Sequence, residues 1–273
     1  MGLQNPYSGV RFPSRPPNFM KKTPKFQFPE VQRWSPAELK MHKQAVRLLE
    51  NILAQAVAKV ARTGVLTEEQ LYQFMLQKML RAGLTSMLNW IIVAYGPSAA
   101  DPHYRFEAGR SRKIVPGHFL LLDIWGKLNR PDAPYSDITH TYFVGKNPPA
   151  RFQKLWTDLQ EARDQALARI SSLCNSQGAT LHEIAKSRLD SGGHAGLFLH
   201  GLGHDLGHDH VHGPGVNLSP KFNCPLLPGR GYTIEPGIYK KGQFGLRSEM
   251  DFFFNAERKV QVTTRLQQKL ECI

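Results

Sequence analysis

The chain has 273 residues, of which 41% are hydrophobic and 21% charged, as in a globular protein that buries a sizeable core. No apolar run approaches the roughly 18 residues of a membrane-spanning helix, and the first residues lack the apolar centre of a signal peptide. Three widely spaced cysteines argue against a disulfide framework and favour a reducing, cytoplasmic location. The net charge of +13 comes without a recognition motif, so specific nucleic-acid binding is not expected.

Residues 1–34 are expected to form an extended tail, because six prolines fall within the first 29 residues and disfavour a helix. The folded domain, residues 35–273, is predicted to begin with a helix that Ser35 caps. A proline takes the first helical position, and Glu38 completes a capping box. Apolar residues then recur at helical spacing up to Gly64, which is expected to end this helix.

The remaining elements are predicted in the order helix, strands, two helices, strands. Thr67 caps a second helix that stops near Gly83, a long helix follows residues 148–149, and Thr180 is expected to cap another helix that ends before Ser191. The predicted strands are residues 91–95, 119–125, 139–144, 232–235, 249–254 and 260–262. Helices and strands thus follow in the same order twice, which predicts an α+β fold with two similar halves.

A histidine-rich segment is the most unusual part of the chain. Five histidines lie within the 13 residues from His200 to His212, interleaved with glycines. Imidazole nitrogens are the commonest transition-metal ligands, and glycines let the backbone approach a site closely. On its own, the segment is also compatible with a surface loop that scavenges metal.

Four carboxylates in apolar surroundings strengthen the metal interpretation. Asp123 lies inside an apolar strand and Asp137 opens the next one, so a hairpin would bring them to neighbouring strands. Glu235 and Glu249 also stand among apolar residues. Each one alone is more often a strand-end charge or an ion-pair partner. With one histidine they form an oxygen-rich set suited to two ions of Mn, Fe, Co or Zn, which can hold a hydroxide and polarise a carbonyl.

At these residues the sequence resembles the creatinase, aminopeptidase P, prolidase and methionine aminopeptidase superfamily over about residues 35–273. The matching segments are residues 96–103, 123, 136–139, 200–204, 227–239 and 245–249. Members have the pita-bread fold, in which a curved, mainly antiparallel sheet encloses a dinuclear metal site. The proline-specific branch matches better than the methionine branch, because of His200, the string 235–239 and Arg247.

The resemblance implies a ligand role for five residues. Asp123 would bind one metal ion, His204 and Glu235 would bind the other, and Asp137 and Glu249 would bridge them. Glu235 would also act as general base. The metal ions would be divalent, with manganese as first candidate.

The resemblance also implies five residues on the substrate side. These are His103, His200, His212, Tyr239 and Arg247. His103 and His212 would help to stabilise the tetrahedral intermediate, and His200 would line the pocket for proline. An extra residue in the histidine-rich segment leaves His210 as an alternative to His212, which the following glycine favours.

The predicted function is a dinuclear metallo-exopeptidase that uses a metal-bridging hydroxide to hydrolyse the peptide bond before proline, with a peptide as partner and a homodimer as an option. Two alternatives stay open. One is a non-catalytic pita-bread module that binds protein or RNA, which the basic charge and the tail in place of the family's amino-terminal domain favour. The other is an activity like that of methionine aminopeptidase.

Overall fold

The computed structural model of the protein describes residues 31–86, 91–107, 109–172 and 175–273. The expected tail at residues 1–30 lies outside this part, and so does Cys174. The folded unit comprises Val31–Ile273, and Trp34 belongs to it: its ring is buried and stacks on Phe253 with 5.9 Å between centroids. In the part of the chain that is described, no helix is long and apolar enough to cross a membrane.

Helix α1 (Pro36–Thr63) begins as its sequence predicts. The Ser35 hydroxyl accepts from the Glu38 amide at 3.2 Å, and the Glu38 carboxylate accepts from the Ser35 amide at 2.6 Å, so both halves of the capping box form. Gly64 ends the helix with φ 74°, a left-handed conformation that glycine adopts without strain. The caps therefore confirm both predicted ends of this helix.

Helices α2 (Glu68–Arg81) and α3 (Ala150–Ser172) also lie where they were predicted. Helix α4 (Gly178–Leu189) starts three residues earlier than a cap at Thr180 predicts, and no side chain caps it, so the cap expected at Thr180 is wrong. The physical reason is tertiary. The first two amides of α4 donate to backbone carbonyls of residues 222–224, which replace a side-chain cap.

The main sheet is built on the predicted hairpin of β5 (Phe119–Leu128) and β6 (Ser136–Phe143). Its other strands are β2 (Leu84–Thr85), β3 (Ile91–Tyr95) and β12 (Glu271–Cys272). The register places Trp125 opposite Asp137, and Asp123 lies two residues away on β5. The antiparallel pairing thus brings the two aspartates to neighbouring strands, as expected.

The two faces of β5 have different partners. Leu120, Leu122 and Ile124 belong to the apolar core that α1 and α2 also form, whereas Asp123 and Trp125 alternate with them. Because successive side chains in a strand point to opposite faces, Asp123 and Trp125 face away from these helices. The alternation of side chains along β5 therefore places Asp123, a predicted metal ligand, on the face of the sheet opposite α1 and α2.

The carboxyl-terminal strands form a second sheet and a small hairpin. The sheet contains β7 (Arg230–Ile234), β10 (Met250–Phe254) and β11 (Val260–Val262), and the hairpin pairs β8 (Gly237–Lys240) with β9 (Phe244–Arg247). Earlier in the chain, β1 (Leu66–Thr67) pairs with β4 (Lys113–Ile114) in a separate two-stranded sheet. Directly before β10, the Glu249 amide donates to the Thr139 carbonyl of β6 at 3.0 Å. This bond joins the two sheets at a predicted ligand.

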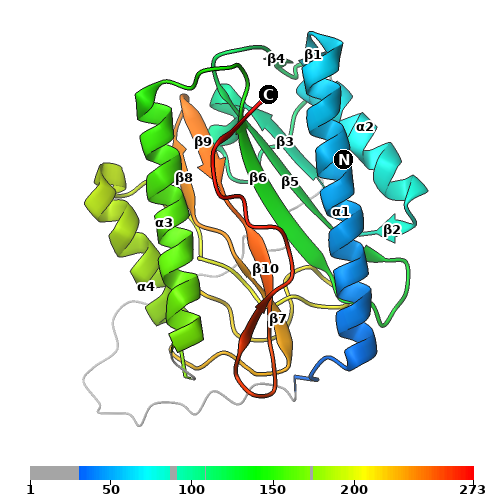
Figure 1. Ribbon diagram of the computed structural model, residues 1–273, viewed down its shortest axis with the longest axis vertical. Coiled ribbons are helices and arrows are strands. Elements are labelled where there is room, and N and C mark those ends of the chain that lie inside the picture. Colours follow the sequence, from blue (N-terminus) through cyan, green and yellow to red (C-terminus); the bar gives the residue numbers. More distant parts are fainter. Residues whose placement is uncertain (1–30, 87–90, 108, 173–174) are drawn as a thin grey trace, which may run out of the picture. The chain divides into compact units, whose positions relative to one another are not determined.

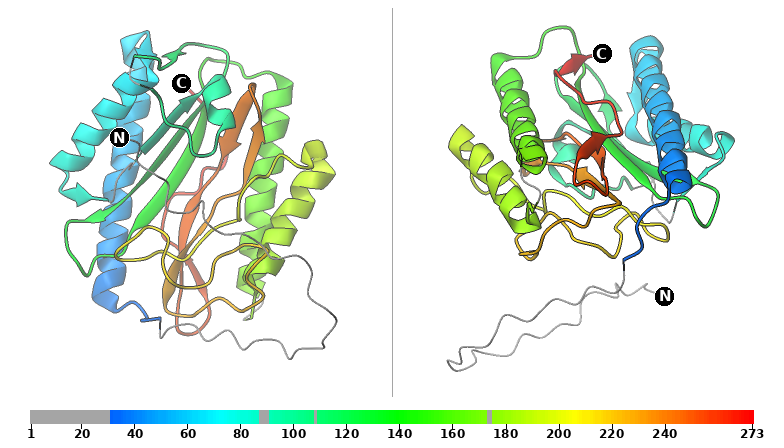
Figure 2. Two further views of the ribbon diagram at one scale, coloured as in Figure 1. Left: turned by 180° about the vertical axis from the view of Figure 1, so that it is seen from behind. Right: turned by 60° about the horizontal axis from the view of Figure 1, so that its bottom comes forward.

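The helices flank the strands in two pairs. Figure 1 shows α1 and α2 on one side of the strands and α3 and α4 on the other, as the two predicted halves require. Residues 195–229, which include the histidine-rich segment, cross the strands on the side seen from behind in Figure 2. The predicted α+β class is confirmed. The histidine-rich segment lies over the face of the strands that Figure 2 shows from behind.

Candidate metal centre

A cavity of about 360 Å³ brings together residues from both sheets and from the histidine-rich segment. Among its lining residues are Asp123, Asp137, His204, Glu235, Glu249, His103, His200, His210, His212 and Arg247. Of the residues predicted for the site, only Tyr239 does not line the cavity. It is buried, and its hydroxyl lies 2.8 Å from His200 Nε2, so it supports the wall from behind.

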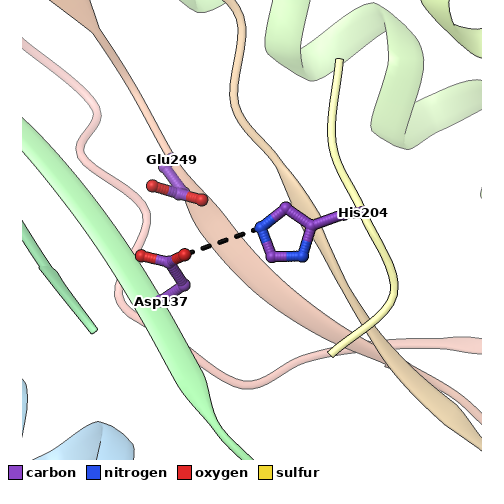
Figure 3. Close-up of side chains that lie close together, drawn as sticks. All are labelled: Asp137, His204 and Glu249. Atoms are coloured by element: carbon purple, nitrogen blue, oxygen red, sulfur yellow. Dashed lines mark ion pairs between the residues drawn. The ribbon is translucent and has the colours of Figure 1, made fainter. Parts of the chain in front are cut away.

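Three of the predicted ligands face one another most closely. Potential ligand atoms of Asp137, His204 and Glu249 all lie within 4.8 Å of each other. Figure 3 shows the three side chains converging from β6, from the segment that precedes β7, and from the residue before β10. Segments far apart in the sequence thus meet at one buried point, where their side chains could hold a metal ion.

The ring of His204 presents a lone pair to the carboxylates. Its Nδ1 lies 3.0 Å from the Asp205 carbonyl oxygen, which can only accept, so Nδ1 carries the proton. Nε2 then faces Asp137 Oδ2 at 3.5 Å and Glu235 Oε1 at 3.8 Å. In the neutral ring Nε2 and these oxygens are all electron-rich, and they repel one another unless a proton or a metal cation lies between them.

Several carboxylate oxygens of the centre lack donors. Asp123 Oδ1, Asp137 Oδ1 and Glu249 Oε1 are buried and accept no hydrogen bond from the described residues. Burial and, after it, neighbouring carboxylates raise the pKa of Asp137 and of Glu249 well above the ordinary value, and burial also raises the pKa of Glu235. Hard oxygen donors with one imidazole nitrogen therefore fit divalent cations such as Mn, Fe, Co or Zn.

Arg247 supports this centre through hydrogen bonds in several directions. Nη2 pairs with Asp123 Oδ2, Nε donates to the Thr139 hydroxyl at 2.9 Å, and Nη1 donates to the Tyr239 hydroxyl at 3.3 Å. The Thr139 hydroxyl in turn donates to Glu249 Oε2 at 2.6 Å. Arg247 therefore orients two predicted ligands. The role of Thr139 was not predicted, although this residue ends the matched segment 136–139.

Both ring nitrogens of His200 are occupied. Nδ1 donates to the Gly201 carbonyl at 2.8 Å, so Nε2 accepts from the Tyr239 hydroxyl. Burial and the nearby Arg247 lower the pKa of His200 to about 3. His200 is thus neutral, and neither ring nitrogen is free to donate a hydrogen bond into the cavity.

The remaining histidines lie at the solvent-exposed rim of the cavity. The ring of His212 is 4.0 Å from that of His204, and the ring of His210 is 5.8 Å from that of His212. The pKa of His212 is lowered to about 3, first because a proton on its ring would be repelled by a proton on the adjacent His204 ring, and second because the ring is partly removed from water. His103 is on the same cavity wall. Both candidates for the second substrate histidine line the cavity, and His212 is the one packed on His204.

A buried ion pair that sequence analysis did not identify fixes the histidine-rich segment. Asp205 takes a two-pronged pair from Arg230, with Nε 2.8 Å from Oδ1 and Nη2 on Oδ2, and both side chains are buried. At Gly203 a β-carbon would collide with the Thr233 carbonyl oxygen, so glycine permits the close approach to β7. No local sequence signal marks Asp205 and Arg230 as partners, because 25 residues separate them.

Comparisons with known proteins identify the family of the chain. The profile described as metallopeptidase family M24 matches residues 40–256. An uncharacterized peptidase of Schizosaccharomyces pombe is 27% identical over 216 residues, which are 79% of this chain and 46% of that protein. This chain therefore spans about half the length of that relative.

Solved structures show the same fold. The dipeptidase PepE of Mycobacterium ulcerans is 26% identical with a TM-score of 0.77, covering 88% of this chain and 61% of its own. The X-Pro aminopeptidase of Thermotoga maritima is 25% identical, also with a TM-score of 0.77, covering 88% and 64%. The pita-bread fold expected from the sequence is thereby confirmed.

Proposed function

Because the chain belongs to metallopeptidase family M24, we propose that it is a metal-dependent exopeptidase that hydrolyses the peptide bond before proline. The observation that carries this proposal is the meeting of four acidic side chains with the lone pair of His204 in one cavity. Similarity to a dipeptidase and to an X-Pro aminopeptidase supports the substrate class.

The ligand set divides between two cations. Asp123 would hold one ion, His204 and Glu235 the other, and Asp137 and Glu249 would bridge the two, which gives a cation to the buried oxygens of Asp123, Asp137 and Glu249 that lack a donor. When bound, two divalent cations, with manganese as first candidate, supply a nucleophilic water at neutral pH and polarise the peptide carbonyl.

The other residues of the cavity handle protons and position the substrate. Glu235 suits the role of general base, because its carboxylate lines the cavity and faces the ring of His204. His212 and His103, at the open side, would donate hydrogen bonds to the developing oxyanion. The ring face of His200 would pack against the proline.

The test is hydrolysis of Xaa-Pro peptides by the full chain with added Mn, Co or Zn. Asp123→Ala and His204→Ala should each lower kcat/KM by about a thousandfold or more and reduce bound metal. Asp132→Ala is the matched control, since Asp132 lies at the surface in an exposed pair with Arg130. A protein that binds no divalent metal, or one that prefers Met-Ala to Ala-Pro, would contradict the proposal.

A further inference from the structure

An arginine without an acidic partner lies on the wall of the metal cavity. Arg105 follows the short helix η1 (Gly96–Ala100) and lines the same cavity as the predicted metal ligands. Arg247, the other arginine on this wall, is paired with Asp123. In the described part of the chain, by contrast, no carboxylate forms a direct ion pair with Arg105.

The guanidinium of Arg105 keeps most of its donors free. Its central carbon lies 5.9 Å from the centroid of the Trp125 ring, and Nη1 donates to the Tyr104 carbonyl at 3.0 Å. A guanidinium has five N–H groups, and the other four make no hydrogen bond to the residues that the structure describes. Stacking uses the face of the group and leaves its edge free, and this edge matches the two oxygens of a carboxylate.

The stacking partner is held in place next to the metal centre. Trp125 lies two residues from Asp123 on β5, so both side chains face the cavity. Its indole packs against two apolar clusters, one with Tyr135 and one with Ile92. Burial lowers the pKa of Arg105 and the charge of Asp123 acts against this change, which puts the guanidinium within electrostatic range of the centre.

Every other charge on the wall has a proposed partner. The four carboxylates are the proposed metal ligands, and Arg247 holds Asp123. The cavity, about 360 Å³, is at the small end of the range for ligand pockets and suits a short peptide. A carboxylate on such a peptide would lie within reach of the positive charge on Arg105.

We propose that Arg105, stacked on Trp125, forms a subsite for a substrate carboxylate and thereby determines specificity. The carboxylate belongs either to the carboxyl terminus of a dipeptide or to an acidic side chain next to the scissile bond. This inference rests on the proposed peptidase function and adds the substrate class that the enzyme prefers.

The first experiment compares matched charged and neutral substrates with the metal-loaded protein. Ala-Pro against Ala-Pro-amide tests the terminal carboxylate, and Glu-Pro-amide against Gln-Pro-amide tests the acidic side chain. The wild-type protein should prefer the charged member of one pair by about tenfold or more in kcat/KM. Arg105→Gln should remove this preference, and Arg105→Lys should keep only part of it, because lysine has the charge without the fork.

A control and a second measurement separate this subsite from peptidase activity. Arg110→Gln should keep the wild-type preference, since Arg110 pairs with Glu107 at the surface. Calorimetry with the metal-loaded protein compares binding of proline with prolinamide and of glutamate with glutamine. If no peptide is cleaved but Arg105→Gln abolishes a preference for carboxylates in binding, the proposed function fails and the subsite stands. Equal ratios in wild type and Arg105→Gln in every pair would overturn the subsite.

Discussion

Asp205 and Asp137 are both buried beside His204, one in sequence and one in space, yet their oxygens have opposite surroundings. Asp205 accepts from the Arg230 fork and from the Gly215 amide at 2.9 Å. Asp137 has one oxygen without a donor, and its other oxygen faces the ring of His204. Of these two carboxylates, the protein thus satisfies the one that shapes a loop and leaves open the one that fits a metal.

The largest expected effect on stability comes from removing the arginine that satisfies Asp205. Arg230→Gln leaves the Asp205 carboxylate buried without its cation, which should lower the free energy of unfolding by about 3–5 kcal/mol. Urea unfolding followed by circular dichroism measures this loss. Arg130→Gln is the matched control: its pair with Asp132 is more than half exposed on both sides and should cost less than about 1 kcal/mol. Equal losses in the two variants would contradict the contrast.

His42 is a buried group that the protein satisfies, like Asp205, and it should make the stability of the protein depend on pH. His42 Nδ1 donates to the Tyr135 carbonyl at 2.8 Å, its Nε2 accepts from the Thr263 hydroxyl at 2.8 Å, and burial lowers its pKa to about 4. A depressed histidine pKa means that the unfolded chain binds more protons, so stability is complete above about pH 6.5 and is lost as the pH falls toward 4. From these pKa values, the contribution of His42 to the free energy of unfolding should fall by about 3 kcal/mol between pH 7 and pH 4.

The measurement is the difference in unfolding free energy between wild type and His42→Gln from pH 7.5 to 4. His140, whose pKa is also lowered to about 4 by burial, is present in both proteins, and its effect cancels. The difference should shrink by about 3 kcal/mol as the pH falls. A difference that stays constant would show that His42 does not titrate in this range.

A bound metal ion should satisfy the carboxylate oxygens of the centre, such as that of Asp137, that have no donor in the protein. With free Mn at about 100 times its dissociation constant, the wild-type protein should gain about 2.7 kcal/mol in unfolding free energy. Asp137→Asn removes a ligand charge at constant shape, so this gain should fall to nearly zero at the same Mn concentration. Thermal unfolding with and without Mn measures both values. An undiminished gain in Asp137→Asn would place the bound metal elsewhere.

The smallest expected effect concerns a hydroxyl that partly satisfies the open site. Thr139→Val removes the donor to Glu249 and the acceptor for Arg247, which should cost about 1–2 kcal/mol in the metal-free protein. Thr139→Ser keeps the hydroxyl and should lose less than the valine variant. Urea unfolding of the two variants side by side tests this order, and the reverse order would show that packing of the methyl group dominates.

Local patterns predicted much of the fold because their causes are local. The capping boxes at Ser35 and Thr67 and the end at Gly64 depend on residues within one turn. The start of α4 was predicted wrongly, because its first amides bond to a segment about 44 residues later in the chain. Carboxylates among apolar residues marked Asp123 and Asp137 as unusual. The pattern contained nothing comparable for Arg105, which lies between the matched segments.

The sequence by itself determined the elements, the hairpin of the two aspartates, the class of donors and the family to which they point. Only the tertiary structure decided which buried charges are satisfied by the protein. Whether a carboxylate is satisfied depends on donors from distant segments, such as Arg230 for Asp205 and Arg247 for Asp123. The same holds for the position of Arg105 over Trp125. Hydrogen bonds and stacking act over a few ångströms in space, and sequence separation carries no information about such distances.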